Sequence, residues 1–216
     1  MESGRDVSRD SDGRRKYDST RRQADAEARH RRIVDEARKL FLENGFVATS
    51  IGQIADAAGV SPQTIYATFG SKAGVLGRAI DVAVVGDYAD VPIFDRFPGL
   101  KTEADLTAYA GFLRNINERV APLIRVMEQA AGADPSLGEL RATLIDRLRD
   151  DCRRWIAELG PKALRKGLTM QEAADAMAVI GSPYVYSFFT VDAGWSPQQY
   201  ERWIAHALPQ LLLRLT

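Results

Sequence analysis

Apolar residues recur every three or four positions along most of this chain, which is the spacing expected of helices with one buried face. The first clear pattern carries Ile33, Ala37 and Phe41, and it ends at Asn44-Gly45, a pair typical of a helix C-terminus. No stretch of strand length alternates between apolar and polar residues. We therefore predict an all-α protein with about nine to ten helices.

Three short helices are predicted next, and serine or threonine caps mark where each begins. Thr49 or Ser50 caps the first, which Gly59 ends; Ser61-Pro62 begins the second, and Ser71 caps the third. Proline suits the first position of a helix because that position needs no N–H donor. Two short helices separated by a glycine turn predict a helix-turn-helix.

The remaining sequence predicts longer helices after a proline-containing loop at residues 87–101. A kink or break is expected at Pro122, because proline cannot donate a hydrogen bond to the carbonyl of Glu118. A bend is expected near Gly181-Ser182-Pro183 for the same reason, and a final helix begins at Ser196-Pro197. The predicted helical ranges are 103–131, 137–159, 170–193 and 196–215.

Composition narrows the class of protein. The 216 residues include 29 basic and 29 acidic side chains, so no global positive charge points to a nucleic-acid partner. Cys152 is the only cysteine, which excludes intramolecular disulfides and thiolate metal clusters. No apolar segment reaches the ~20 residues needed to span a bilayer, and none follows Met1 as a secretory signal would. We expect a soluble cytoplasmic protein with no membrane partner.

Motifs for catalysis are nearly absent. The sequence has no nucleophile elbow, no phosphate-binding loop and no dinucleotide-binding glycine motif. Glu27 and His30 have the spacing of a helical di-iron ligand pair, but such sites need the motif on two helices. Asp150-Asp151 resembles a magnesium-diphosphate motif, yet Arg154 stands where another acid would be needed. We predict no catalytic residues, no metal and no cofactor.

The segment from Phe46 to Ser71 contains a single charged residue, Asp56, among many hydroxyl and amide groups. Such groups, together with the free N–H groups of three helix N-termini, suit phosphate oxygens without net positive charge. Gln63, Thr64 and Ala67 fall on the side opposite Ile65 and Phe69, where a recognition helix faces base edges. A plain helical hairpin with capping hydroxyls is the alternative interpretation of these features.

The same region resembles the N-terminal domain of the TetR family of bacterial transcriptional regulators over about residues 26–78. The matching positions are Ala37, Leu40, Phe41, Gly45, Thr49-Ser50-Ile51, Ile54-Ala55, Ala58-Gly59-Val60-Ser61, Thr64-Ile65-Tyr66, Phe69 and Ser71-Lys72. The chain departs from the family pattern at Ala73, where a glutamate is common, and at Thr68, where many members carry an aromatic residue or histidine.

This resemblance implies a homodimer in which each subunit has a three-helix DNA-binding domain and a helical domain that binds a small molecule and dimerises. It places Thr49, Ser61, Tyr66 and Lys72 on phosphates, and Gln63, Thr64 and Thr68 at the major groove. Ser50 completes the predicted DNA-binding set. We expect a disordered tail at 1–23, and its second half is basic. A DNA-binding domain should follow at 24–72, and a ligand-binding and dimerisation domain at 73–216.

We predict a ligand-responsive regulator of transcription. Because repression is the habit of the family, we expect a repressor that an apolar or aromatic effector releases from a pseudo-palindromic DNA operator. Candidate effector contacts lie on helices that the family uses for its cavity: Phe112, Ile116, Arg119, Met127, Trp155, Met177, Tyr184 and Phe188. The last two helices are expected to hold the dimer, with an apolar stripe of Met177, Ile180, Tyr184 and Phe188 on the first of them. The candidate dimer contacts on the last helix are Tyr200, Ile204, Leu208, Leu211 and Leu215.

Two alternatives stay open from the sequence. The apolar stripes of the last two helices could pack inward, although both helices also show a second apolar side, with Val185 and Phe189 on one and Trp203 on the other. The chain could also be an all-α enzyme or a helical adaptor that does not bind DNA. Binding to its own promoter region would separate a regulator from either.

Overall fold

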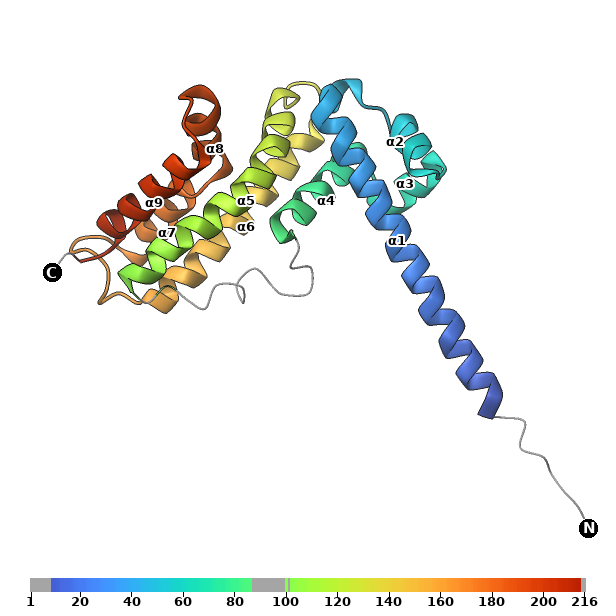
Figure 1. Cartoon of the computed structure of the whole chain (residues 1–216), viewed down its shortest axis with the longest axis horizontal. Helices are drawn as coiled ribbons and strands as arrows, with labels where there is room; N and C mark the ends of the chain where they lie inside the picture. Colours follow the sequence, from blue (N-terminus) through green and yellow to red (C-terminus); the bar gives the residue numbers. More distant parts are fainter. Residues whose placement is uncertain (1–8, 87–99, 101, 215–216) are drawn as a thin grey trace, which may run out of the picture.

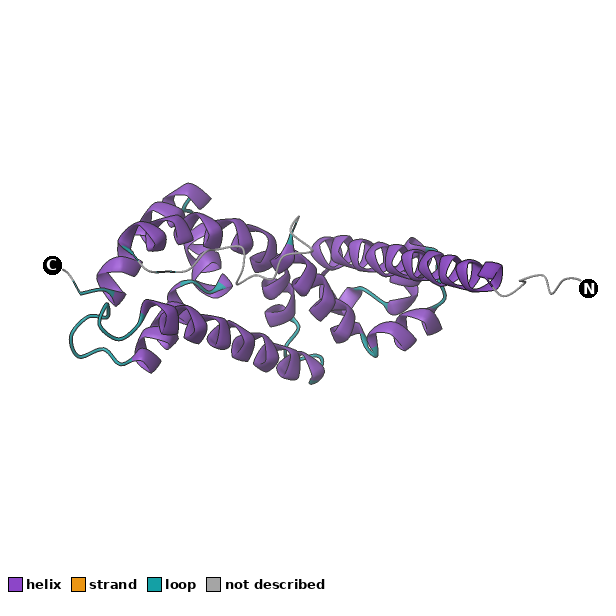
Figure 2. Cartoon of the chain, turned by 90° about the horizontal axis from the view of Figure 1, so that it is seen from below, coloured by secondary structure: helices purple, strands orange, loops and turns teal. Residues whose placement is uncertain are grey.

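The computed structural model describes residues 9–86, 100 and 102–214. The molecule is elongated, with helices α1 to α4 at the N-terminal end and α5 to α9 bundled at the other (Figure 1). Throughout the described ranges the regular structure is helical, as Figure 2 shows, which confirms the predicted fold class. Of the described helices, none has the length and apolarity needed to cross a bilayer.

Four helices make up the N-terminal end, and three of them, α2, α3 and α4, begin at the predicted caps. They are α1 (Arg9–Ala48), α2 (Ile51–Ala58), α3 (Pro62–Phe69) and α4 (Lys72–Val85). Near the end of α1, Gly45 leaves helical geometry with φ 78° and ψ 170°. The stop predicted at Asn44-Gly45 therefore lies where the regular helix ends.

The N-terminal tail is helical over more of its length than the sequence indicated. We predicted disorder over residues 1–23, whereas α1 begins at Arg9 and projects beyond the rest of the domain (Figure 1). Residues 1–8 lie outside the described part. The physical reason for the difference is that extending an existing helix adds one hydrogen bond per residue fixed, so it needs no apolar partner. Arginine, lysine and glutamine also favour helix.

The C-terminal end is formed by α5 (Glu103–Gln129), α6 (Ser136–Leu159), α7 (Met170–Ile180), α8 (Pro183–Ser187), the π-helical turn η2 (Phe188–Asp192) and α9 (Pro197–Leu212). The expected interruption near Gly181 is present, because α7 ends at Ile180 and Ser182 caps α8. Pro122 instead lies within a continuous α5, on its exposed side. A carbonyl left without a donor there can bind water.

Two apolar cores hold the helices together. The first joins Phe41 of α1, Ile65 of α3 and Leu76 of α4 to Leu123 of α5 and Leu137 of α6, all of them buried. The second core lies among α5, α6, α7 and α9, and includes Tyr109, Trp155, Met177 and Tyr200. The domain boundary predicted at residue 72 therefore does not divide the molecule into two separate cores. Helix α4 and the adjoining ends of α5 and α6 share one core with the helix-turn-helix.

Candidate nucleic-acid interface

The turn between α2 and α3 is built from capping residues. Ser50 Oγ accepts the N–H of Gln53, and the Gln53 side chain accepts the N–H of Ser50 in return. Gly59 ends α2 at φ 65°, a left-handed conformation that glycine adopts without steric cost. Ser61 Oγ then accepts the N–H of Thr64 and caps α3. These contacts form the predicted helix-turn-helix.

Helix α3 has one buried face and one exposed face. Ile65 is fully buried, and Phe69 is half-buried against the first core. Gln63, Tyr66 and Ala67 are exposed, and Tyr66 keeps 54% of its surface accessible. The face that we predicted to meet DNA is thus open to solvent.

Thr64 and Thr68 lie on the flank of α3 that faces α1. They line a groove of about 420 Å³ together with residues of α1 that include Gln23 and Arg29. Thr64 Oγ1 lies 3.0 Å from Ser61 Oγ, and Thr68 Oγ1 donates to the carbonyl of Thr64 at 2.8 Å. Their hydroxyls are engaged within the helix, so these two threonines flank the exposed face rather than occupy its centre.

Thr49 does not lie where the resemblance placed it. Its side chain is fully buried, and its hydroxyl contacts the carbonyls of Leu40 and Gly45 at 3.1 and 2.7 Å. A buried hydroxyl bonded in this way joins the end of α1 to the start of α2, and it cannot bind a phosphate. The predicted phosphate contact of this side chain is therefore wrong.

Lys72 also makes its hydrogen bonds within the domain. Its ammonium donates to the carbonyls of Phe46 and Thr49 at 2.7 and 2.8 Å, and it lies 4.2 Å from the centroid of the Phe46 ring. Burial lowers the pKa of Lys72, and the nearby Asp134 opposes that shift. Lys72 thus joins the start of α4 to the chain between α1 and α2, a structural role that the sequence did not predict.

His30 packs against the recognition helix from α1, with its ring centroid 4.8 Å from that of Phe69. Burial, followed by the positive charge of Arg78, lowers the pKa of His30 from 6.5. Below pH 6.5 the unfolded chain takes up this proton before the folded chain does, so the free energy of unfolding should fall with decreasing pH. Above pH 6.5 this contribution is fully present.

This prediction is checked by urea unfolding between pH 7.5 and 5, comparing the wild type with His30→Phe. The substitution keeps an aromatic ring against Phe69 but has no proton to bind. The stability of the wild type relative to the variant should decline as the pH falls, and parallel pH profiles would contradict the role given to His30.

The predicted effector contacts lie in several places. Phe112, Trp155 and Met177 belong to the second core, whereas Ile116, Met127 and Tyr184 pack with the first. Arg119 donates from Nε to the carbonyl of Ala83 at 2.8 Å, near the C-terminus of α4. Phe188 is exposed. The structure does not bring these eight side chains around one cavity.

The predicted dimer contacts also need correction. Tyr200, Ile204 and Leu208 are completely buried inside the subunit, where α9 packs along α5. Side chains buried there cannot meet a second subunit. Leu211 is half-buried and lines a surface groove, and Leu215 lies outside the described residues.

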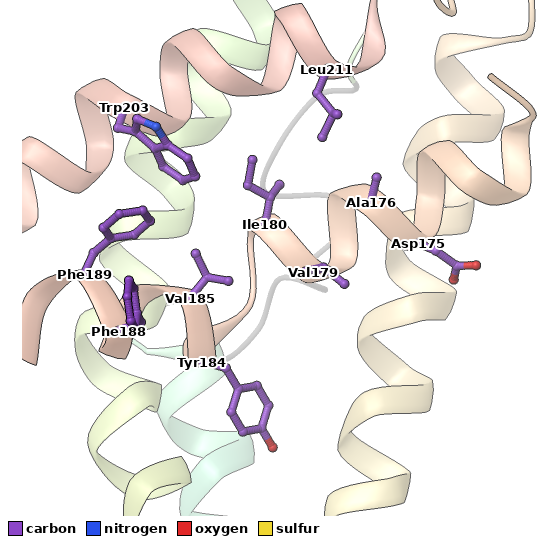
Figure 3. Close-up of a pocket in the computed structure, with 10 residues that line it drawn as sticks. All are labelled: Asp175, Ala176, Val179, Ile180, Tyr184, Val185, Phe188, Phe189, Trp203 and Leu211. Atoms are coloured by element: carbon purple, nitrogen blue, oxygen red, sulfur yellow. The ribbon is translucent and has the colours of Figure 1, made fainter. Parts of the chain in front are cut away.

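That groove, of about 790 Å³, lies across α7, α8, η2 and α9, and it is almost entirely apolar (Figure 3). We call it the apolar groove, and its lining residues are Asp175, Ala176, Val179, Ile180, Tyr184, Val185, Phe188, Phe189, Trp203 and Leu211. Val179 and Phe188 expose 65% and 59% of their surfaces. The sequence placed Ile180, Tyr184 and Phe188 of this lining on the apolar stripe of a helix expected to dimerise, and Val185, Phe189 and Trp203 on the second apolar side.

Tyr184 ties the wall of the apolar groove to the core that holds the helix-turn-helix. Its hydroxyl donates to Glu128 Oε1 at 2.8 Å, and Arg141 Nε donates to the same oxygen at 3.0 Å. Burial, and then the bond to Glu128, raises the pKa of Tyr184 to about 12. The hydroxyl therefore stays protonated, and a donor, at neutral pH.

Comparisons with known proteins agree with this geometry. Residues 33–79 match the family described as bacterial regulatory proteins, tetR family. The chain is 37% identical over 81 residues to the HTH-type transcriptional repressor BdcR of Escherichia coli (strain K12), an alignment that covers 35% of this chain and only 40% of that relative.

Solved structures extend the similarity in fold to most of the chain. NalD, the secondary repressor of the MexAB-OprM multidrug efflux pump in Pseudomonas aeruginosa, superposes with a TM-score of 0.65 and 19% identity, covering 88% of this chain and 98% of NalD. A transcriptional regulator from Rhodococcus sp. Rha1 gives a TM-score of 0.58 at 17% identity, covering 84% and 95%. The match to the tetR family of bacterial regulatory proteins thus covers residues 33–79, which hold the helix-turn-helix, and the likeness of the rest of the chain to these solved structures is one of fold.

Proposed function

We propose that this protein is a homodimeric, ligand-responsive regulator of transcription that represses by binding a pseudo-palindromic operator in bacterial cytoplasmic DNA. The observation that carries the proposal is the exposed, uncharged polar face of α3, held by a capped helix-turn-helix within the residues that match the family. Such a face suits the edges of bases in a major groove.

A dimer is proposed because one recognition helix reads too few base pairs to select a site in a genome. Two copies related by a twofold axis place two α3 helices on half-sites one helical turn, about 34 Å, or a multiple of it apart. We assign the interface to the apolar groove, because exposed apolar patches of this kind on a folded subunit commonly mark interaction surfaces.

Ligand response is proposed through the helices that surround the second core. The cluster of Tyr109, Phe112 and Trp155, whose ring centroids lie 4.8 to 6.2 Å apart, supports an apolar or aromatic effector. An effector that binds better to a form of the dimer with displaced α3 helices would release the operator.

The proposal is tested by footprinting the protein on DNA upstream of its own gene at several salt concentrations. A protected pseudo-palindrome is expected, with an affinity that falls linearly on a logarithmic salt scale. Scrambled DNA of equal length is the control. Equal affinity for both DNAs, or no binding at low salt, would exclude sequence-specific regulation through this domain.

A further inference from the structure

The exposed face of α3 carries few kinds of side chain, so it can recognise only certain bases. We propose that Gln63 selects an adenine and Ala67 a thymine, so that each operator half-site has A·T pairs beneath the centre of α3. This inference rests on the proposed function and adds to it the base identity that the chain recognises.

The geometry of α3 puts Gln63 and Ala67 together at the centre of its exposed face. Successive residues of a helix turn by about 100°, so positions four apart differ by only about 40°. Ile65, which is fully buried, lies nearly opposite both. Tyr66 and Thr64 fall on the two flanks, and Thr64 lines the groove against α1. A DNA groove that receives α3 therefore meets Gln63 and Ala67 first.

Guanine is a poor candidate for the bases at this centre. Arginine and lysine make the commonest specific contact to guanine, and α3, with the sequence PQTIYATF, contains neither. The hydroxyls of Ser61, Thr64 and Thr68 are already engaged within the helix. These observations leave the Gln63 amide as the chief polar group for reading bases.

The Gln63 amide is available for this contact. Within the described part of the chain its side chain makes no hydrogen bond, whereas the amide of the neighbouring Gln53 is held in the capping box of α2. A free glutamine amide matches adenine, donating to N7 and accepting from the N6 amino group. The Ala67 methyl matches the 5-methyl group of thymine.

The spacing of the two residues sets the spacing of the two bases. Four residues of a helix advance about 6 Å along its axis, and base pairs are stacked about 3.4 Å apart. Gln63 and Ala67 therefore reach base pairs that are adjacent or separated by one. The expected half-site has an adenine and a thymine, on either strand, within three base pairs.

Selection from DNA with randomised half-sites tests the proposal, using the full-length wild type, Gln63→Ala and Gln63→Glu. The wild type should select adenine at one position per half-site. Gln63→Ala should lose that preference by about tenfold while keeping the flanking preferences. Gln63→Glu should shift the preference to cytosine, because a carboxylate accepts from its N4 amino group. Gln53→Ala is the matched control, and its selected bases should equal those of the wild type.

Base analogues then examine the individual atoms in the selected site. Replacing the adenine with 7-deazaadenine in one half-site should weaken the wild type about tenfold and leave Gln63→Ala unaffected. Uracil in place of the thymine should cost about threefold in the wild type, the size expected for one buried methyl group, and nothing in Ala67→Gly.

The outcomes separate this inference from the proposed function. Specific sites that carry G·C at the position controlled by Gln63, or a preference that survives Gln63→Ala, would overturn the base assignment and leave the regulator intact. Failure of the wild type to select any site would refute the proposed function and this inference together.

Discussion

Glutamate in place of both Val179 and Phe188 is expected to give a folded monomer that has lost specific DNA binding. Both side chains are largely exposed on one subunit, so two charges there cost the fold of the subunit little. In a dimer formed across the apolar groove the same charges would lose their water without gaining partners. Sedimentation should show a single subunit, and operator affinity should drop on the order of 100-fold or more, because half of the base contacts are lost.

Two further variants show whether the effect belongs to this surface. Met170→Glu places a charge on another partly exposed apolar residue, at the start of α7 and outside the groove, and should leave the dimer intact. Leu208→Glu buries a charge in the second core and should unfold the subunit instead of dissociating it. A Val179→Glu, Phe188→Glu protein that still sediments as a dimer would move the interface elsewhere.

Methionine in place of Lys72 is expected to lower the stability of the protein and weaken DNA binding without changing its salt dependence. The variant keeps an aliphatic side chain but loses two hydrogen bonds from a charged group, for a loss of about 2–3 kcal/mol. For a chain of this length that corresponds to a Tm lowered by about 5–10 °C. Calorimetry and gel shifts over a range of salt concentrations provide the two measurements.

The salt dependence of DNA binding distinguishes a structural role of Lys72 from a contact between Lys72 and a phosphate. A lysine that neutralised one phosphate per subunit would contribute about 1.8 to the logarithmic slope of a dimer, and its removal would flatten the plot. We expect equal slopes for the wild type and Lys72→Met. Lys39→Met, at an exposed lysine paired with Glu36 on α1, should leave both Tm and slope unchanged.

The local features of the helix-turn-helix were predictable because they depend on short stretches of sequence. Serine and proline at Ser61-Pro62, and the glycine at Gly59, specify a cap and a turn wherever they occur in such a pattern. The roles of Thr49 and Lys72 were not predictable in this way. Each side chain makes hydrogen bonds to backbone carbonyls of another segment. The types of the residues do not reveal which carbonyls the fold brings within reach.

The interface role of Tyr200, Ile204 and Leu208 was mispredicted for a different reason. Helix α9 has apolar residues on two sides, and periodicity gives their spacing but not which side meets α5. Tyr200 and Ile204 fill the second core, which leaves Trp203 on the outer side with Phe189 against it at 4.6 Å between ring centroids. Only the packing of α9 on its neighbours distinguishes the two stripes.

The first core has a consequence for protein engineering. Leu76, Leu123 and Leu137 pack in this core with residues of α1 and α3. The helix-turn-helix therefore cannot be transferred to another protein as a segment that ends at Lys72. A chimera joined there would set a foreign α4 and a foreign α5–α6 turn against Phe41 and Ile65. Exchanging operator specificity between relatives should therefore succeed by grafting the exposed positions of α3 alone, and should fail when whole N-terminal segments are exchanged at that junction.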